Sequence, residues 1–65
     1  MDYPRAIKEL RERRFLTQEE LAKLLHVSFI SVNRWENGHF EPTMKIKRKL
    51  NQMFIESNIK ENANE

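Results

Sequence analysis

The 65-residue sequence contains no cysteine, one glycine and no long run of apolar residues. Because cysteine is absent, neither a disulfide nor a thiolate-bound metal can stabilise this short chain, and a compact helical core must hold it together. No segment approaches the roughly 20 apolar residues of a membrane-spanning helix, and no secretory signal is visible. The sequence therefore predicts one small domain, soluble and cytoplasmic, without membrane association.

The sequence also lacks the parts of a catalytic site. It contains no evident nucleophile–base pair and no glycine-rich loop that would cradle a phosphate, and a single glycine leaves little room for such a loop. His39 is the only other histidine that could bind a metal together with His26. We therefore expect no enzymatic activity, no cofactor, no metal and no small-molecule substrate.

The net charge of +2 conceals an asymmetry along the chain. Residues 1–55 contain 11 Lys and Arg against 7 Asp and Glu, whereas residues 56–65 contain one Lys and three Glu. A basic body favours a polyanionic partner such as nucleic acid. Charged faces that are simply hydrated would give the same asymmetry, so charge alone does not decide the partner.

Helix-start signals occur at four places in the chain. Asp2, Thr17, Ser28 and Thr43 can each accept a hydrogen bond from a free N–H in the first turn of a helix. Glu20 lies three residues after Thr17 and completes a capping box. The sequence therefore predicts an all-α fold of four, or at most five, helices.

Apolar residues recur at helical spacing after each of these signals. The residues expected to face inward are Ile7, Leu10, Leu21, Leu24, Leu25, Val32, Trp35, Ile46, Leu50, Met53 and Phe54. Ile55 and Ile59 form a weaker second stripe and, with Met53 or Phe54, are the only spare apolar residues near the C-terminus for a dimer contact. The predicted domain is residues 1–56, followed by a polar tail, residues 57–65, that is expected to fray or be disordered.

The second and third predicted helices stand at the centre of this pattern. The second begins at Thr17, and the third runs from Ser28 to Asn37, where Asn37-Gly38 favours the left-handed backbone that ends a helix. Two short helices joined by a turn of about four residues have helix-turn-helix spacing.

These residues resemble the phage repressor and Cro family of helix-turn-helix proteins, also called XRE-type. The matching strings are LTQEELA at residues 16–22, VS at 27–28 and VNRWENG at 32–38, followed by Pro42, and the likeness covers about residues 5–54. The resemblance implies a compact, all-α, lambda-repressor-like domain that binds double-stranded DNA. It also implies a homodimer on a two-fold operator and a small transcriptional regulator, most readily a repressor.

The resemblance further implies roles for individual residues. Residues 28–37 become the recognition helix that enters the major groove, while the preceding helix crosses the DNA backbone. Gln18 matches a glutamine that contacts phosphate, and Glu36 matches a glutamate that in some members pairs with an arginine, here Arg11. His26 departs from the family, in which glycine is common at this turn position, so we expect a strained turn or one of another form.

One side of the third helix is free for DNA if Val32 and Trp35 point inward. The side chains predicted to contact bases are Ser28, Phe29, Ile30, Asn33 and Arg34. Asparagine pairs bidentately with adenine, arginine with guanine, and apolar groups meet thymine methyl groups. Two alternatives remain open: Phe29 or Ile30 packs against the preceding helix or the Phe40 loop, and Arg34 binds phosphate or a glutamate.

Phosphate contacts are predicted from hydroxyl, amide and ammonium groups near helix ends. The residues in this set are Thr17, Gln18, Asn37 and Lys45. The rest of the basic run at residues 45–49 is interpreted as a solvated face, and Trp35 as a core residue.

Two other functions fit the same pattern. The fold could serve as a protein-interaction module, such as an antitoxin or anti-repressor, with Phe29 and Ile30 binding protein. The chain could also be the DNA-binding part of a larger protein, although Met1 and the polar ending favour an intact small protein.

Overall fold

The computed structural model describes residues 2–59, and residues 60–65 of the predicted tail lie outside this range. The described residues form four α-helices and no strand: α1 (Tyr3–Arg14), α2 (Gln18–Leu25), α3 (Phe29–Glu36) and α4 (Met44–Glu56). The predicted all-α, four-helix fold is confirmed. None of these helices is long and apolar enough to cross a lipid bilayer.

Each helix begins at the capping residue that the sequence predicted. The side chains of Asp2, Thr17, Ser28 and Thr43 each accept a hydrogen bond from the N–H three residues later. At α2 the capping box is complete, because Glu20 Oε1 accepts from the Thr17 N–H at 2.8 Å while Thr17 Oγ1 accepts from the Glu20 N–H at 3.0 Å. The helix starts are therefore fixed by local sequence.

The four helices also end alike, each with a residue in the left-handed region. These residues are Phe15 (φ 57°), His26 (φ 59°), Gly38 (φ 77°) and Asn58 (φ 60°). In each case the next residue donates its N–H to the carbonyl five positions earlier, as in a Schellman motif. The turn between α2 and α3 thus keeps the left-handed form although His26 stands where glycine would be unstrained.

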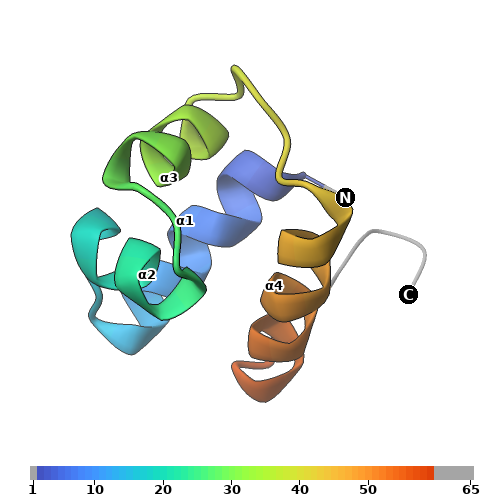
Figure 1. Cartoon of the computed structure of the whole chain (residues 1–65). Coiled ribbons are helices and arrows are strands. Elements are labelled where there is room, and N and C mark those ends of the chain that lie inside the picture. The colour runs from blue at the N-terminus through green and yellow to red at the C-terminus, as the bar shows by residue number, and fades with distance from the viewer. Residues whose placement is uncertain (1, 60–65) are drawn as a thin grey trace.

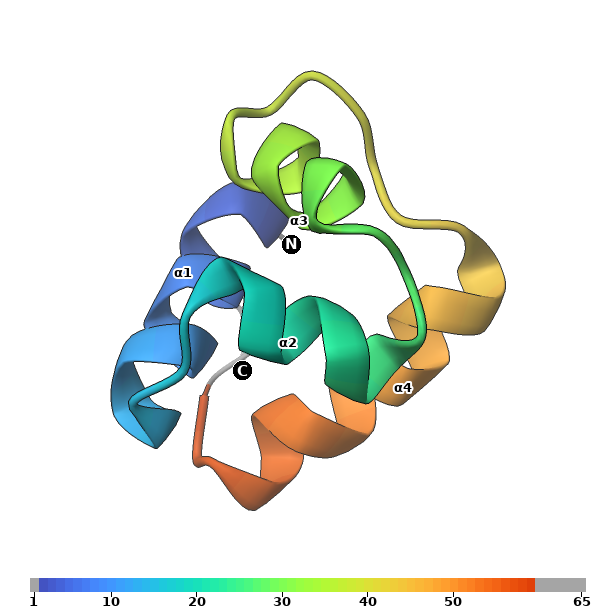
Figure 2. The ribbon, with the colours of Figure 1, turned by 60° about the vertical axis from the view of Figure 1, so that its left-hand side comes forward.

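The packing of the four helices centres on α1 and α3. α1 contacts both α3 and α4, and α2 contacts α3 (Figure 1). Figure 2 shows α2 in front of α1, with α3 above both helices. The connection from α3 to α4 runs along the outer surface of the molecule. α3 is therefore supported from below by two helices while its other side faces outward.

A single core joins the four helices. Its buried residues are Ala6, Ile7, Leu10, Leu21, Ala22, Leu25, Val32, Trp35, Ile46, Leu50, Phe54 and Ile59. The prediction for Leu24 was wrong, because its side chain is 53 % exposed. The buried arc of α2 is centred on Leu25, between Leu21 and Ala22, so Leu24 lies beyond its edge.

The end of α4 also differs from expectation. Ile59 is 7 % exposed and Phe54 is 1 % exposed, so neither is available for a dimer contact. Asn58 turns the chain back, and the Ile59 N–H donates to the Phe54 carbonyl at 2.8 Å. The packed part of the chain therefore reaches Ile59, beyond residue 56, and Ile55 stays 64 % exposed.

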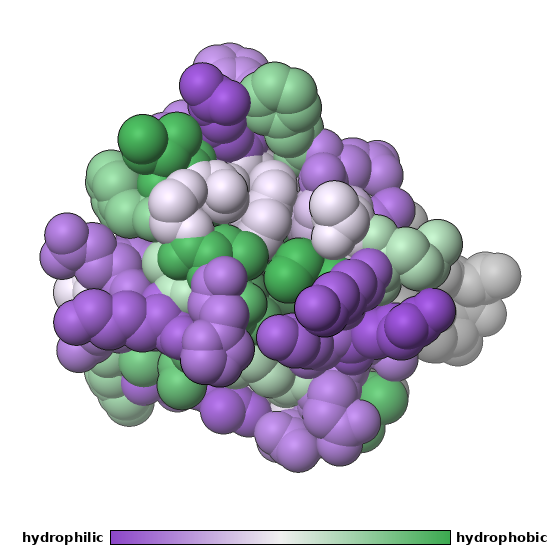
Figure 3. Space-filling model, in the orientation of Figure 1, coloured by the Kyte–Doolittle hydropathy of each residue, from purple (hydrophilic) through white to green (hydrophobic). Residues whose placement is uncertain are grey.

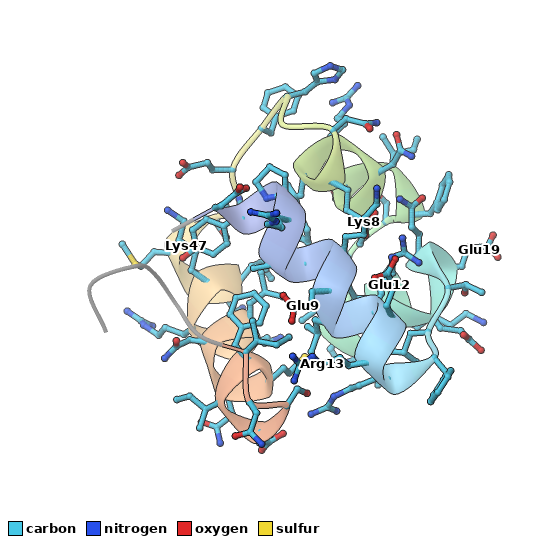
Figure 4. The ribbon with its side chains drawn as sticks, turned by 180° about the vertical axis from the view of Figure 1, so that it is seen from behind. Lys8, Glu9, Glu12, Arg13, Glu19 and Lys47 are labelled. Atoms are coloured by element: carbon cyan, nitrogen blue, oxygen red, sulfur yellow. The ribbon has the colours of Figure 1, made fainter. Side chains whose placement is uncertain are left out.

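Two arginines at the end of α1 hold this C-terminal turn. Arg13 donates to the Ser57 carbonyl at 2.8 Å, and Arg14 Nε donates to Ser57 Oγ at 2.9 Å. Arg14 also forms an ion pair with Glu56 at 3.2 Å, and Arg13 pairs with Glu9 at 2.8 Å. The view from behind shows Glu9 and Arg13 on α1, facing α4 (Figure 4). These arginines tie α1 to α4.

Candidate nucleic-acid interface

α3 has one side buried and one side exposed, as its sequence predicted. Val32 is fully buried and Trp35 is 6 % exposed, which places both in the core. Phe29 and Ile30, in the first turn, are 45 % and 57 % exposed. The space-filling view shows hydrophobic surface over the start of α3 (Figure 3). Two large apolar side chains therefore face solvent at the N-terminal end of α3, directly after the turn that joins it to α2.

Part of Phe29 faces α2. Its side chain borders an open hollow of about 250 Å³ that is also lined by Glu19, Ala22, Lys23 and Val27. The alternative that Phe29 packs against the preceding helix is therefore only partly met, because nearly half of its surface remains accessible.

Arg34 lies at the other end of the exposed side of α3. Its guanidinium carbon is 5.1 Å from the centroid of the Phe40 ring, in a cation–π contact with the loop after α3. Phe40 is itself 58 % exposed, so the contact leaves Arg34 at the surface. The loop thus orients the guanidinium without neutralising it.

An ion pair joins α1 to the end of α3. Arg11 Nε donates to Glu36 Oε2 at 2.6 Å and Arg11 Nη2 donates to Glu36 Oε1 at 2.9 Å, in a bidentate arrangement. The side chain of Glu36 is 4 % exposed and that of Arg11 is 18 % exposed. Arg11 Nη1 also donates to the Leu16 carbonyl at 3.2 Å. The pair that the resemblance implied is present and largely shielded from water.

The ion pair continues into a row of amide side chains. Gln18 Nε2 donates to Glu36 Oε1 at 3.0 Å, and Asn33 Nδ2 donates to Gln18 Oε1 at 3.2 Å. Asn37 Nδ2 in turn donates to Asn33 Oδ1 at 3.0 Å. Residues predicted as separate base and phosphate contacts therefore touch one another.

The ion pair also shifts the pKa values of Glu36 and Arg11. Burial acts to raise the pKa of Glu36, but hydrogen bonds from Arg11 and Gln18 outweigh it and leave that pKa below its ordinary value. The hydrogen bond to Glu36 raises the pKa of Arg11. Both groups are therefore charged at neutral pH.

The lowered pKa of Glu36 predicts an acid-sensitive fold. In the unfolded chain Glu36 takes up its proton at higher pH than in the folded chain, so the unfolded state binds more protons and stability rises with pH. This contribution is complete above the ordinary pKa of 4.5 and is lost as pH falls through the lower folded value. Urea titrations at a series of pH values measure this effect. As the pH falls below 4.5, the unfolding free energy should decrease more steeply in the wild type than in Glu36→Gln. Parallel pH profiles for the two proteins would contradict this account.

The predicted phosphate contacts lie at helix ends around α3. Thr17 and Gln18 begin α2, Asn37 follows α3, and Lys45 is an exposed residue in the first turn of α4. Figure 1 shows α3 between the start of α2 at the left and the start of α4 at the right. Lys47, in contrast, is bound to Glu41 at 2.9 Å.

A helix-turn-helix family model matches residues 7–54 of the sequence. The chain belongs to the XRE-type helix-turn-helix family. Within the family pattern, α2 and α3 are the two helices of the motif, and His26 lies in the turn between them.

One curated helix-turn-helix protein illustrates the relationship. The HTH-type transcriptional activator BcrR of Enterococcus faecalis is 33 % identical over 54 residues, which cover 83 % of this chain and 26 % of that protein. The chain thus spans about a quarter of that relative's length. No solved structure matches this helix-turn-helix chain.

Sequence reasoning missed the amide row and the contact of Arg34 with Phe40. A signal for the amide row was present in the sequence: Asn33, Glu36 and Asn37 follow one another at i, i+3 and i+4 and so form a polar stripe along the second helix of the helix-turn-helix motif. No comparable spacing links Arg34 to Phe40, because Phe40 lies in a loop.

Proposed function

We propose that this chain binds double-stranded DNA sequence-specifically through α3 and regulates transcription. The proposal rests on one observation: α3 has one buried side and one exposed side. Val32 and Trp35 anchor one side in the core, while Phe29, Ile30 and Arg34 are exposed on the helix that XRE-type proteins insert into the major groove.

Base recognition is assigned to the first turn and the exposed side of α3. Phe29 and Ile30 have the accessible apolar surface that suits thymine methyl groups, and the Asn33 amide suits adenine. Ser28 caps the helix at the end that faces the groove, and Arg34 suits either guanine or the adjacent phosphate.

Phosphate contacts are assigned to Thr17, Gln18, Asn37 and Lys45. Helix starts carry free backbone N–H groups that suit phosphate oxygens. The placement of these residues at the ends of helices around α3 supports contacts to the backbone next to the groove that α3 enters.

Selection from a random pool of DNA duplexes tests the proposal. The full chain should enrich a defined sequence, and gel shifts should show that the enriched duplex outcompetes scrambled duplexes. Failure to retain any duplex at low salt would contradict DNA binding and would favour a protein-interaction module.

Asn33→Ala and Lys45→Ala are expected to affect binding differently. Asn33→Ala should relax the preference at one base pair, with a loss of roughly 1–3 kcal/mol of discrimination, because a base-edge contact is removed. Lys45→Ala should weaken all duplexes alike and reduce the slope of log affinity against log salt by about 1. Competition titrations at several salt concentrations measure both effects.

The matched control is Asn51→Ala, which removes an exposed asparagine of α4 outside the proposed interface. It should change neither the base preference nor the salt slope. If Asn33→Ala and Lys45→Ala gave the same pattern, the division into base readers and phosphate anchors would be wrong.

The functional assembly is proposed to be a homodimer on a two-fold operator in the cytoplasm. Ile55, exposed on α4, is the apolar residue assigned to the contact between subunits. A dimer bound across a promoter would repress by occluding it. Sedimentation with and without the selected duplex tests the dimer, and a promoter–reporter assay distinguishes repression from the activation named for the enterococcal relative.

A further inference from the structure

Along the row of hydrogen bonds from Arg11 to Asn37, chemistry decides which group donates and which accepts. Arg11 can only donate, and the ionised Glu36 carboxylate can only accept. Gln18 must therefore turn its Nε2 toward Glu36, at 3.0 Å, which leaves Gln18 Oε1 to face Asn33. Asn33 must then present Nδ2 to Gln18, and its Oδ1 accepts from Asn37.

We propose that Gln18 and Glu36 are positioning residues that hold the amide of Asn33 in one of its two orientations and so determine which base it reads. This inference rests on the proposed role of Asn33 as a base reader. It assigns to the ion pair of Arg11 and Glu36 an effect on DNA specificity in addition to its effect on stability.

In this orientation the Asn33 amide has one donor and one acceptor left for a base. Its Nδ2 has one further N–H and its Oδ1 one further lone pair after the bonds to Gln18 and Asn37. Adenine offers an acceptor at N7 and a donor at N6, which match this pair. Guanine offers two acceptors, N7 and O6, so one of them would meet the fixed Oδ1. An amide released from Gln18 could turn its Oδ1 away from guanine and donate from Nδ2 alone to N7 or O6, and discrimination would fall.

Gln18→Met tests the proposal, because methionine preserves the length of the side chain but removes both hydrogen bonds. The measured quantity is the ratio of affinities for adenine and guanine at the base pair whose preference Asn33→Ala abolishes. We expect Gln18→Met to lower this ratio roughly two- to tenfold, within the range of couplings found in one hydrogen-bond network. In the Asn33→Ala background, Gln18→Met should leave the ratio unchanged.

A phosphate contact by Gln18 alone predicts another result. Gln18→Met would then weaken all duplexes equally and leave the ratio unchanged, which would overturn the positioning role while sequence-specific binding survived. If Asn33→Ala abolished no preference at any base pair, the base-reader assignment and this inference would both be overturned.

Gln52→Met is the matched control, since Gln52 is exposed on α4 and its side chain bonds to no residue within 2–59 other than Glu56, at 3.3 Å. It should leave the ratio at its wild-type value. If Gln18→Met does not melt cooperatively, Gln18→Ala replaces it under the same criterion, because alanine adds no apolar bulk beside the ion pair and favours the helix.

Discussion

Glu36→Ala is expected to lower the free energy of unfolding by about 3–5 kcal/mol. Its side chain is 4 % exposed and receives hydrogen bonds from Arg11 and Gln18. Removing the carboxylate leaves a shielded guanidinium without a counter-charge, and this uncompensated charge is the main destabilising effect. Small domains have unfolding free energies of about 5–15 kcal/mol, so the variant should lose a large share of its stability. Urea denaturation followed by circular dichroism measures the change.

The ion pair between Glu9 and Arg13 supplies the matched control. Both side chains are more than 40 % exposed, so water already screens their attraction. Glu9→Ala should therefore change stability by less than about 1 kcal/mol. Combining Arg11→Met with Glu36→Leu should recover much of the loss, since no unpaired charge remains. Equal effects of Glu36→Ala and Glu9→Ala would show that the Arg11 pair is no stronger than a surface pair.

Phe54→Ala is expected to destabilise the fold by about 3–5 kcal/mol, whereas Ile55→Ala should change the stability of the single chain by less than about 0.5 kcal/mol. Phe54 is 1 % exposed, its ring centroid lies 6.5 Å from that of Tyr3, and its carbonyl accepts the N–H of Ile59. Ile55 is the next residue and is 64 % exposed. Thermal unfolding of both variants at low protein concentration measures the contrast.

The concentration dependence of this experiment separates packing from association. If Ile55 contributes to a dimer, Ile55→Ala should lower the melting temperature at high protein concentration but not at low concentration. A large loss at low concentration would mean that Ile55 is part of the core and would remove it from the proposed dimer contact.

Local signals in the sequence were sufficient to predict the helices. A cap such as Thr17 or Ser28 bonds to an N–H three residues away, so its effect depends on neighbours in the chain. The inward side of α3 followed from Val32 and Trp35 for the same reason. The all-α fold and the positions of α2 and α3 were therefore predictable without knowledge of the packing.

Features that depend on packing were predicted less well. Leu24 has the spacing of a buried residue, but the buried side of α2 is centred on Leu25 and leaves Leu24 53 % exposed. Ile59 lies in a polar stretch, and only the left-handed turn at Asn58 brings it back to the core. The bond between Gln18 and Asn33 joins residues 15 positions apart and requires the two helices to be docked.

The central claim is that the exposed side of α3 is the surface that meets DNA. The most direct test is a titration of the isotopically labelled full chain with the selected duplex, followed by NMR of backbone and side-chain amides. The largest changes are predicted at Ser28, Phe29, Ile30 and Asn33, with smaller changes at Lys45. Changes concentrated instead on Arg13, Arg14 and Ile55, with α3 unaffected, would contradict it.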